Sequence, residues 1–296
     1  MQRSPRLNIE RPKLGALAPT GLIDARKQLH HALQLVASGA RSFATPQPKD
    51  AHAQLSWMPE HDALVTEPLG ASEESPRLAL QLDTPSVAIV KSDGTWIRLP
   101  LTGRVRTEAA GWLRAQMAVL DLHAASYLLD CPYVIPHHPV TDGIRFFEPS
   151  DVALGTPEEL AKWFMFADSK LRAVSAREEH ASDVKCSPHH FSIATQIALP
   201  QSGTSGRPSS MAVGMSPGDA SFEMPYFYVT PSPTPDPNTP RPDLLRGRWR
   251  SDGWSGAVLT VDKLLAPGNA TPEEQLNDFL GSAIEAVRTC HEKTRS

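Results

Sequence analysis

Short alternating segments between residues 52 and 101 are the feature that most constrains the fold of this chain. Apolar and polar residues alternate around Leu55, Leu80 and Leu99, which is the period of a strand with one buried face. The dipeptide Asp93-Gly94 separates two of these segments and is typical of a tight hairpin. The region therefore predicts an antiparallel meander.

Four segments with the period of amphipathic helices surround and follow this meander. The first starts at Leu22 and is expected to end at Gly39, and the second is expected to begin with Thr107 as its cap. The later two start with the same tetrapeptide, Thr-Pro-Glu-Glu, at Thr156 and at Thr271. In both, threonine is expected to cap the helix and the second glutamate to bond back to it. The prediction is an α+β fold, with antiparallel sheet elements covered by about four amphipathic helices.

The order of these segments divides the chain into a tail and two lobes. Residues 1–20 are predicted to form a flexible N-terminal tail. Residues 21–150 are predicted to form a helix-plus-meander lobe, and residues 151–296 a second helix-plus-sheet lobe. The proline-rich segment 231–242 is expected to be a surface loop of the second lobe. Because helix precedes strands in both lobes, two similar lobes remain one hypothesis, although residue identity between them is slight.

Composition and charge narrow the class of protein. Hydrophobic residues make up 40% of the chain and charged residues 21%, which is typical of a globular protein with a buried core. The formal net charge is -4 and no basic stripe is present, so nucleic acid is not an expected partner. No apolar stretch is long enough to span a bilayer, so no membrane partner is expected. Three widely spaced cysteines and a polar N-terminus favour a cytoplasmic location.

The densest basic segment contains three alternating arginines, Arg246, Arg248 and Arg250. Alternate residues of a strand face the same side, so the three side chains are expected to form one row. A solvent-exposed edge is the simpler interpretation. An anion-binding site is the alternative.

The pair His189-His190 is the most informative polar feature of the second lobe. On a strand, neighbouring side chains point to opposite faces, which assigns His189 and Phe191 to the core. His190 then shares a small polar face with Ser192 and Gln196, as the wall of a pocket would. His190 is therefore the better functional candidate. The alternative is a histidine that is hydrogen-bonded beneath a loop.

An acid and two tyrosines complete the candidate site. Asp219 follows a dipeptide at 217–218 that is expected to form a type II turn, and its carboxylate is expected to cap that turn. If Asp219 meets His190 in space, the two form an acid–base pair. Tyr226 and Tyr228 share a strand face, where they either pack on the sheet or direct their hydroxyls into the same pocket.

Two spacings match parts of known catalytic or metal motifs. Cys186 and His189 have the spacing of half a zinc site, but a whole site needs three or four ligands and no second pair is present. These two residues are therefore weak metal candidates, and the cofactor is left unassigned. Residues 214–218 match G-x-S-x-G, but Pro217 follows the serine and has no N–H with which to build an oxyanion hole. No Walker loop or dinucleotide-binding glycine motif is present.

Three segments of the second lobe resemble the motifs of a bacterial family that has no assigned activity. They are SPHHFSIA at 187–194, VGMSPGD at 213–219 and PYFYVTP at 225–231. The likeness extends over about residues 22–265, and Cys186 stands where a larger apolar residue would be expected. The family implies no substrate or cofactor, so the resemblance supports the fold and leaves the function open.

Two functional hypotheses follow from the sequence. The first is a cytosolic enzyme or small-molecule-binding protein whose pocket uses His190 and Asp219 for catalysis and Ser192, Gln196, Tyr226 and Tyr228 for ligand binding. The second is a non-catalytic interaction protein that uses the proline-rich loop and an apolar surface. A concave pocket that contains the histidine and the acid favours the first hypothesis, and a flat apolar patch favours the second. Reaction, substrate and oligomeric state are not predicted.

Overall fold

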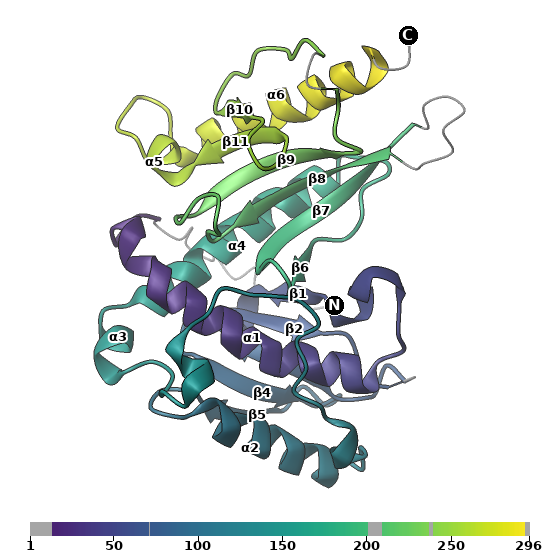
Figure 1. Ribbon diagram of the computed structural model, residues 1–296, viewed down its shortest axis with the longest axis vertical. Helices are drawn as coiled ribbons and strands as arrows, with labels where there is room; N and C mark the ends of the chain where they lie inside the picture. The colour runs from purple at the N-terminus through teal and green to yellow at the C-terminus, as the bar shows by residue number, and fades with distance from the viewer. Residues whose placement is uncertain (1–13, 71, 201–208, 237–238, 294–296) are drawn as a thin grey trace, which may run out of the picture.

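A computed structural model of the chain describes residues 14–70, 72–200, 209–236 and 239–293. Within these ranges, eleven strands form one antiparallel sheet in the order β10-β11-β9-β8-β7-β6-β1-β2-β3-β4-β5 (Figure 1). The strands are β1 Leu55–Met58, β2 Ala63–Thr66, β3 Arg77–Gln81, β4 Ser86–Val90, β5 Trp96–Pro100, β6 Lys185–Ser187, β7 Ser192–Leu199, β8 Ser209–Ser216, β9 Tyr226–Ser232, β10 Arg248–Arg250 and β11 Gly256–Thr260. The predicted α+β class is confirmed.

Strands β1 to β5 form the predicted meander, because each pairs with the next strand along the chain. The hairpin between β4 and β5 closes through a hydrogen bond from the N–H of Lys91 to the carbonyl of Thr95, 2.9 Å long. Gly94 has a φ of +82°, which explains the need for glycine in this turn. The Asp93-Gly94 hairpin is confirmed.

The second half of the sheet joins the first through β1 and β6, which pair antiparallel with Leu55 opposite Cys186. From β6 to β9 each strand pairs with the next, and β11 then lies between β9 and β10. A long helix precedes and another follows the strands in each half. The order of elements is therefore alike in the two halves, and a duplication of one unit stays a prediction.

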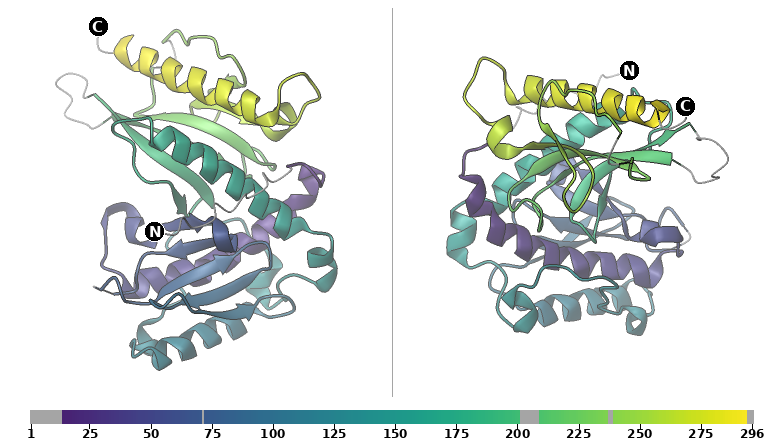
Figure 2. Two further views of the ribbon diagram at one scale, coloured as in Figure 1. Left: turned by 180° about the vertical axis from the view of Figure 1, so that it is seen from behind. Right: turned by 45° about the horizontal axis from the view of Figure 1, so that its top comes forward.

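The described residues form four long α-helices and two short ones, and three of the long helices cover this sheet. The helices are α1 Ile23–Phe43, α2 Arg106–Val119, α3 Pro149–Ala153, α4 Thr156–Ser175, α5 Val261–Leu264 and α6 Pro272–Lys293. Helix α1 packs on β2 to β4, α4 packs on β7 and β8, and α6 packs on β8, β9 and β11. Figure 2 shows α4 and α6 on the same side of the C-terminal strands. One core cluster includes side chains from both halves, so the halves share a single hydrophobic core.

Helix α1 continues past Gly39, where it was expected to end. A Cβ atom at Gly39 would lie 2.2 Å from Cδ1 of Leu78 on β3. The glycine is therefore a close-packing position that lets the helix approach the sheet, and the helix runs on to Phe43. None of the described helices combines the length and the apolar character that crossing a bilayer requires.

The predicted caps have three different outcomes. At α6 the capping box is confirmed: Oγ1 of Thr271 accepts from the N–H of Glu274 at 3.2 Å, and the Glu274 carboxylate accepts from the N–H of Thr271 at 2.8 Å. At α2 the cap is Val105, whose N–H donates to the Glu108 carboxylate, so the assignment to Thr107 was wrong by two positions.

At α4 the cap is Gly155, which has a φ of +72°, and Thr156 is already the first helical residue. The second glutamate, Glu159, is 1% exposed and accepts instead from the N–H of Gly15 at 2.7 Å. The same tetrapeptide therefore has a different function at α4, because a segment distant in sequence takes the carboxylate.

The predicted tail and loop fall partly outside the described residues. Residues 1–13 and 237–238 are not described. In the rest of the predicted tail, Leu14 and Leu17 pack against the core, so 14–20 do not form a tail. The proline-rich loop is held at its end by Trp249, whose ring N–H donates to the carbonyl of Pro242 at 2.8 Å.

Candidate functional site

The two central histidines lie in the turn between β6 and β7 rather than on a strand. The strands pair up to both ends of residues 188–191, which we call the histidine turn. Pro188 has no N–H to donate to the sheet, and Phe191 has a left-handed backbone with a φ of +51°. The strand alternation therefore fails here. The assignment of His189 to the core was wrong, and both histidines are exposed.

Two side chains of α1 hold the histidine turn in place. The carbonyl oxygen of Pro188 accepts hydrogen bonds from Nε2 of His30 at 3.0 Å and from Nε2 of Gln34 at 2.8 Å. The His30 ring also stacks on Phe191, with 5.5 Å between ring centroids. Burial lowers the pKa of His30 to about 4, since a charged ring would lose its hydration. His30 is therefore neutral and carries its proton on Nε2.

The exposed rings of the histidine turn form a stack. His189 lies between His190, at 4.0 Å, and Tyr133, at 4.3 Å between ring centroids. The Tyr133 hydroxyl donates to Oε1 of Gln34 at 3.0 Å and accepts from Arg41. The stack ties the turn to α1 and to the chain before α3, and it restricts the orientation of His190.

Asp219 lies in the connection between β8 and β9, residues 217–225, which we call the acidic loop. Its Oδ1 accepts from the N–H groups of Ser221 at 2.7 Å and Phe222 at 3.1 Å. The carboxylate therefore caps the chain that follows it, and the expectation that it caps a turn at 217–218 was wrong. Its Oδ2 accepts from the Tyr226 hydroxyl at 2.5 Å. Three hydrogen bonds hold the carboxylate, and the loop leads into a strand, unlike the helix that follows a serine-hydrolase elbow.

His190 and Asp219 line one cavity of about 500 Å³, which we call the histidine cleft. Its walls are the start of α1, residues 134–137, the histidine turn and the acidic loop. The histidine and the acid therefore line the same cavity, and their action as an acid–base pair stays a prediction. The pKa of His190 lies below its ordinary value, chiefly because the walls of the cleft partly desolvate the ring and disfavour its charged form, and also because His189 lies alongside. The Asp219 charge opposes this shift.

Arg26 is the cation that the sequence analysis missed. It lines the histidine cleft from α1, only 6% of the residue is exposed, and its buried Nε has no hydrogen-bond partner. Among the described residues it forms no ion pair within 4.0 Å. Burial lowers the pKa of Arg26, while the more distant charges of Asp219 and Glu223 act in the opposite direction. The available signal was its position, since Arg26 follows Leu22 by four residues on the apolar face of the helix.

None of the predicted ligand-binding residues lines the cleft itself. Tyr226 reaches the cleft only through its bond to Asp219, and burial raises its pKa. Tyr228 on β9 forms a hydrogen bond with Ser192 on β7, and neither of these two residues lines the cleft. Gln196 is exposed on β7 and does not line the cleft either. The predicted polar wall is therefore only partly assembled.

The two weak metal candidates, Cys186 and His189, differ in burial. Cys186 is fully buried in the sheet, and burial raises the pKa of its thiol. His189 is exposed in the histidine turn. In the part of the chain that the structure describes, no three His, Cys, Asp or Glu side chains are grouped so as to hold a metal ion.

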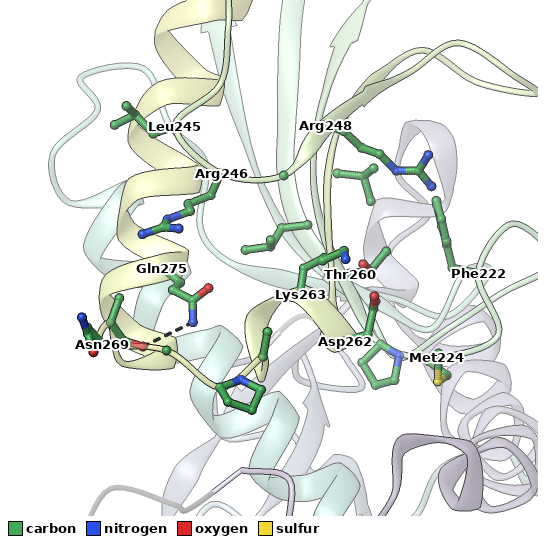
Figure 3. Close-up of a pocket in the computed structure, with 18 of the residues that line it drawn as sticks. Phe222, Met224, Leu245, Arg246, Arg248, Thr260, Asp262, Lys263, Asn269 and Gln275 are labelled. Carbon is green, nitrogen blue, oxygen red and sulfur yellow. Dashed lines mark hydrogen bonds between the residues drawn. The ribbon is translucent and has the colours of Figure 1, made fainter.

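A second and larger cavity, of about 1010 Å³, lies over β10, β11, α5 and the start of α6 (Figure 3). We call it the arginine cavity, because Arg246 and Arg248 line it together with Lys263. Gly247 has a φ of +76° and turns the chain between the two arginines, so the expected single row of arginines is wrong. The third arginine, Arg250, lies over the rings of Phe222 and Trp254.

Comparison of this chain with protein-family models, with curated proteins and with solved structures gives no match. The resemblance to a bacterial family through the three motifs of the second lobe therefore stays a prediction. The site must be interpreted from its own geometry.

Proposed function

We propose that this protein is a cytosolic small-molecule-binding protein whose ligand is an organic acid with an apolar body, bound in the histidine cleft. The observation that carries the proposal is Arg26, a buried guanidinium that lines a cavity and has no ion-pair partner among the residues that the structure describes. Removing an ion from water costs several kcal/mol, of order ~5, unless an opposite charge and hydrogen bonds compensate it. A carboxylate in the cleft would supply both, because guanidinium and carboxylate match as a two-point pair.

The remaining walls suit the body of such a ligand. Val134 is 93% exposed at the edge of the cleft, and Ile135 and Pro136 follow it along the same wall. An apolar group that covered Val134 would remove apolar surface from water, which is favourable by about 25 cal/mol per Å². The charged end and the apolar end of the ligand are thus matched by different walls.

The direct test is a melting-temperature screen with pairs of molecules that differ only in charge. The probes are benzoate, phenylacetate and 3-phenylpropionate, each beside its own amide. At least one acid should raise the melting temperature more than its amide does, since binding to the folded state alone stabilises it. The shift should vanish in Arg26→Met and persist in Arg177→Met, an exposed arginine at the end of α4. Equal shifts from acids and amides would contradict the proposal.

One observation favours a catalytic version of this function. Because its pKa is lowered, His190 is neutral near neutral pH and is able to accept a proton, and Asp219 on the same cavity wall stabilises the resulting imidazolium. A bound acid should raise the pKa of His190 by placing a negative charge near the ring. A histidine NMR titration with and without the acid found in the screen measures this, and an unchanged His190 titration would remove the histidine from the site.

The interaction-protein alternative has less support from the described surface. Trp249 and Cys290 contact the proline-rich loop at Pro242 and Pro240, so this part of the loop packs on the body of the protein. On the sheet face opposite α1, Ala63 and Ala88 are fully buried rather than displayed. Neither feature forms the flat apolar patch that this alternative requires.

A further inference from the structure

The arginine cavity owes its shape to a glycine. A Cβ atom at Gly247 would lie 2.5 Å from the carbonyl oxygen of Val258 and 2.8 Å from the Phe279 ring. With no side chain there, the chain before β10 lies directly on β11 and α6, and Arg246 and Arg248 leave it in different directions. Figure 3 shows Lys263 between these two arginines. The cavity therefore brings together three cations, from the chain before β10, from β10 itself and from α5.

The three cations differ in how well they are neutralised. Nε of Arg246 lies 3.6 Å from the Asp278 carboxylate on α6. For Arg248 and Lys263, no ion pair within 4.0 Å is found among the described residues. Two positive charges of the cavity wall are thus available to a ligand.

Acceptor groups line other parts of the same cavity. Glu223 and Asp262 belong to its wall, and the Gln275 amide is fixed because its NH₂ donates to the carbonyls of Leu264 at 3.1 Å and Ala270 at 3.3 Å. The fixed amide leaves its own oxygen as an acceptor. These groups would accept hydrogen bonds from hydroxyls of a ligand.

We propose that the arginine cavity is a second ligand site, which binds a small phosphate ester with a hydroxyl-bearing body. Arg248 and Lys263 hold the phosphate, since guanidinium and ammonium groups both donate charge-assisted hydrogen bonds to phosphate oxygens. Glu223, Asp262 and Gln275 accept from the hydroxyls. The volume of about 1010 Å³ suits a molecule larger than the ligand of the histidine cleft. A long polyanion is disfavoured, because the whole chain carries a formal net charge of -4.

The acidic loop places the two sites back to back. Residues 218–220 line the histidine cleft, and residues 222–225 line the arginine cavity. Asp219 fixes this loop through Ser221 and Phe222, so the two walls are parts of one hydrogen-bonded unit.

Isothermal titration calorimetry with ribose 5-phosphate tests the second site, with ribose as the uncharged control. The expected result is binding of ribose 5-phosphate to one site and no heat from ribose. The double variant Arg248→Gln with Lys263→Gln should weaken binding by about tenfold or more, whereas Arg177→Gln should leave it unchanged. Arg26→Met should also leave it unchanged, which separates this site from the histidine cleft. Absence of binding to the native protein, equal binding by the double variant, or loss of binding only in Arg26→Met would each overturn the proposal.

Discussion

The histidine cleft and the arginine cavity lie on either side of one loop, yet they hold their positive charge in opposite ways. Arg26 in the cleft is 6% exposed and has no ion-pair partner among the described residues, whereas Arg246, Arg248 and Lys263 in the larger cavity are exposed. An exposed cation keeps most of its hydration, so its presence needs no ligand to explain it. A buried cation loses that hydration and needs a compensating group.

Because its cation is buried, the histidine cleft gives stronger evidence for a bound ligand than the arginine cavity does. The cleft contains His30 and His190, whose pKa values are lowered, beside one buried guanidinium, so protons and burial should control its behaviour. The larger cavity should respond to ionic strength, because its charges face water. Both responses can be measured.

The largest expected effect is the loss of stability in acid that His30 causes. Its folded-state pKa of about 4 lies below the ordinary value of 6.5, so the unfolded chain takes up the proton first as the pH falls. The contribution of His30 to the free energy of unfolding is constant above about pH 6.5 and is lost as the pH falls toward about 4. The loss amounts to about 3 kcal/mol. Urea unfolding across this pH range measures the slope. His30→Gln should flatten it, whereas His123→Gln, at an exposed position, should not. The same slope in both variants would contradict the assignment.

Replacement of Arg26 should have the next largest effect on stability. It tests whether the buried cation of the histidine cleft differs from the exposed cations of the arginine cavity. Arg26→Met removes an uncompensated buried charge and keeps a side chain of similar length, so the free energy of unfolding without ligand should rise by about 1–2 kcal/mol. Arg248→Met, the exposed counterpart, should change it by less than about 0.5 kcal/mol. Chemical denaturation of both variants gives the two numbers. A marked loss of stability in Arg26→Met would mean that the guanidinium already has a compensating partner.

The fold was largely predictable because its signals are local. Strand alternation and the Asp93-Gly94 turn depend on neighbours in sequence, and both lie in the meander where they were expected. Gly39 was misassigned because its reason is Leu78, a residue on another element. Propensity alone cannot distinguish a glycine that ends a helix from one that allows close packing.

The site was less predictable because it depends on which segments meet. His190 could be singled out from its expected polar strand face and Asp219 from its position after an expected turn, and both line one cavity. The strand alternation used to place Gln196 beside His190 fails, because residues 188–191 form a turn. Arg26 was overlooked because one arginine on an apolar helix face has no significance until its surroundings are known.

Ionic strength should separate the two ligand sites by about tenfold in affinity. Raising NaCl from about 0.05 M to about 0.5 M should weaken ribose 5-phosphate binding about tenfold, because the charges of Arg248 and Lys263 face water. The acid bound at Arg26 should lose less than about twofold, since a buried pair is screened less. Calorimetry at several salt concentrations gives both slopes. Equal slopes would show that the two sites do not differ in burial.

The smallest expected effect concerns the residues at the starts of two helices. Helix α6 contributes Gln275 to the arginine cavity and begins with the capping box at Thr271, so Thr271→Ala should lower the free energy of unfolding by about 1 kcal/mol. Helix α2 has Val105 as its cap, so Thr107→Ala, at an exposed position inside the helix, should change the free energy of unfolding by no more than about 0.5 kcal/mol. Urea unfolding of the two variants measures the difference. Equal losses would contradict a stabilising role for the Thr271 cap, because only Thr271 accepts a hydrogen bond from the first turn of its helix in this pair.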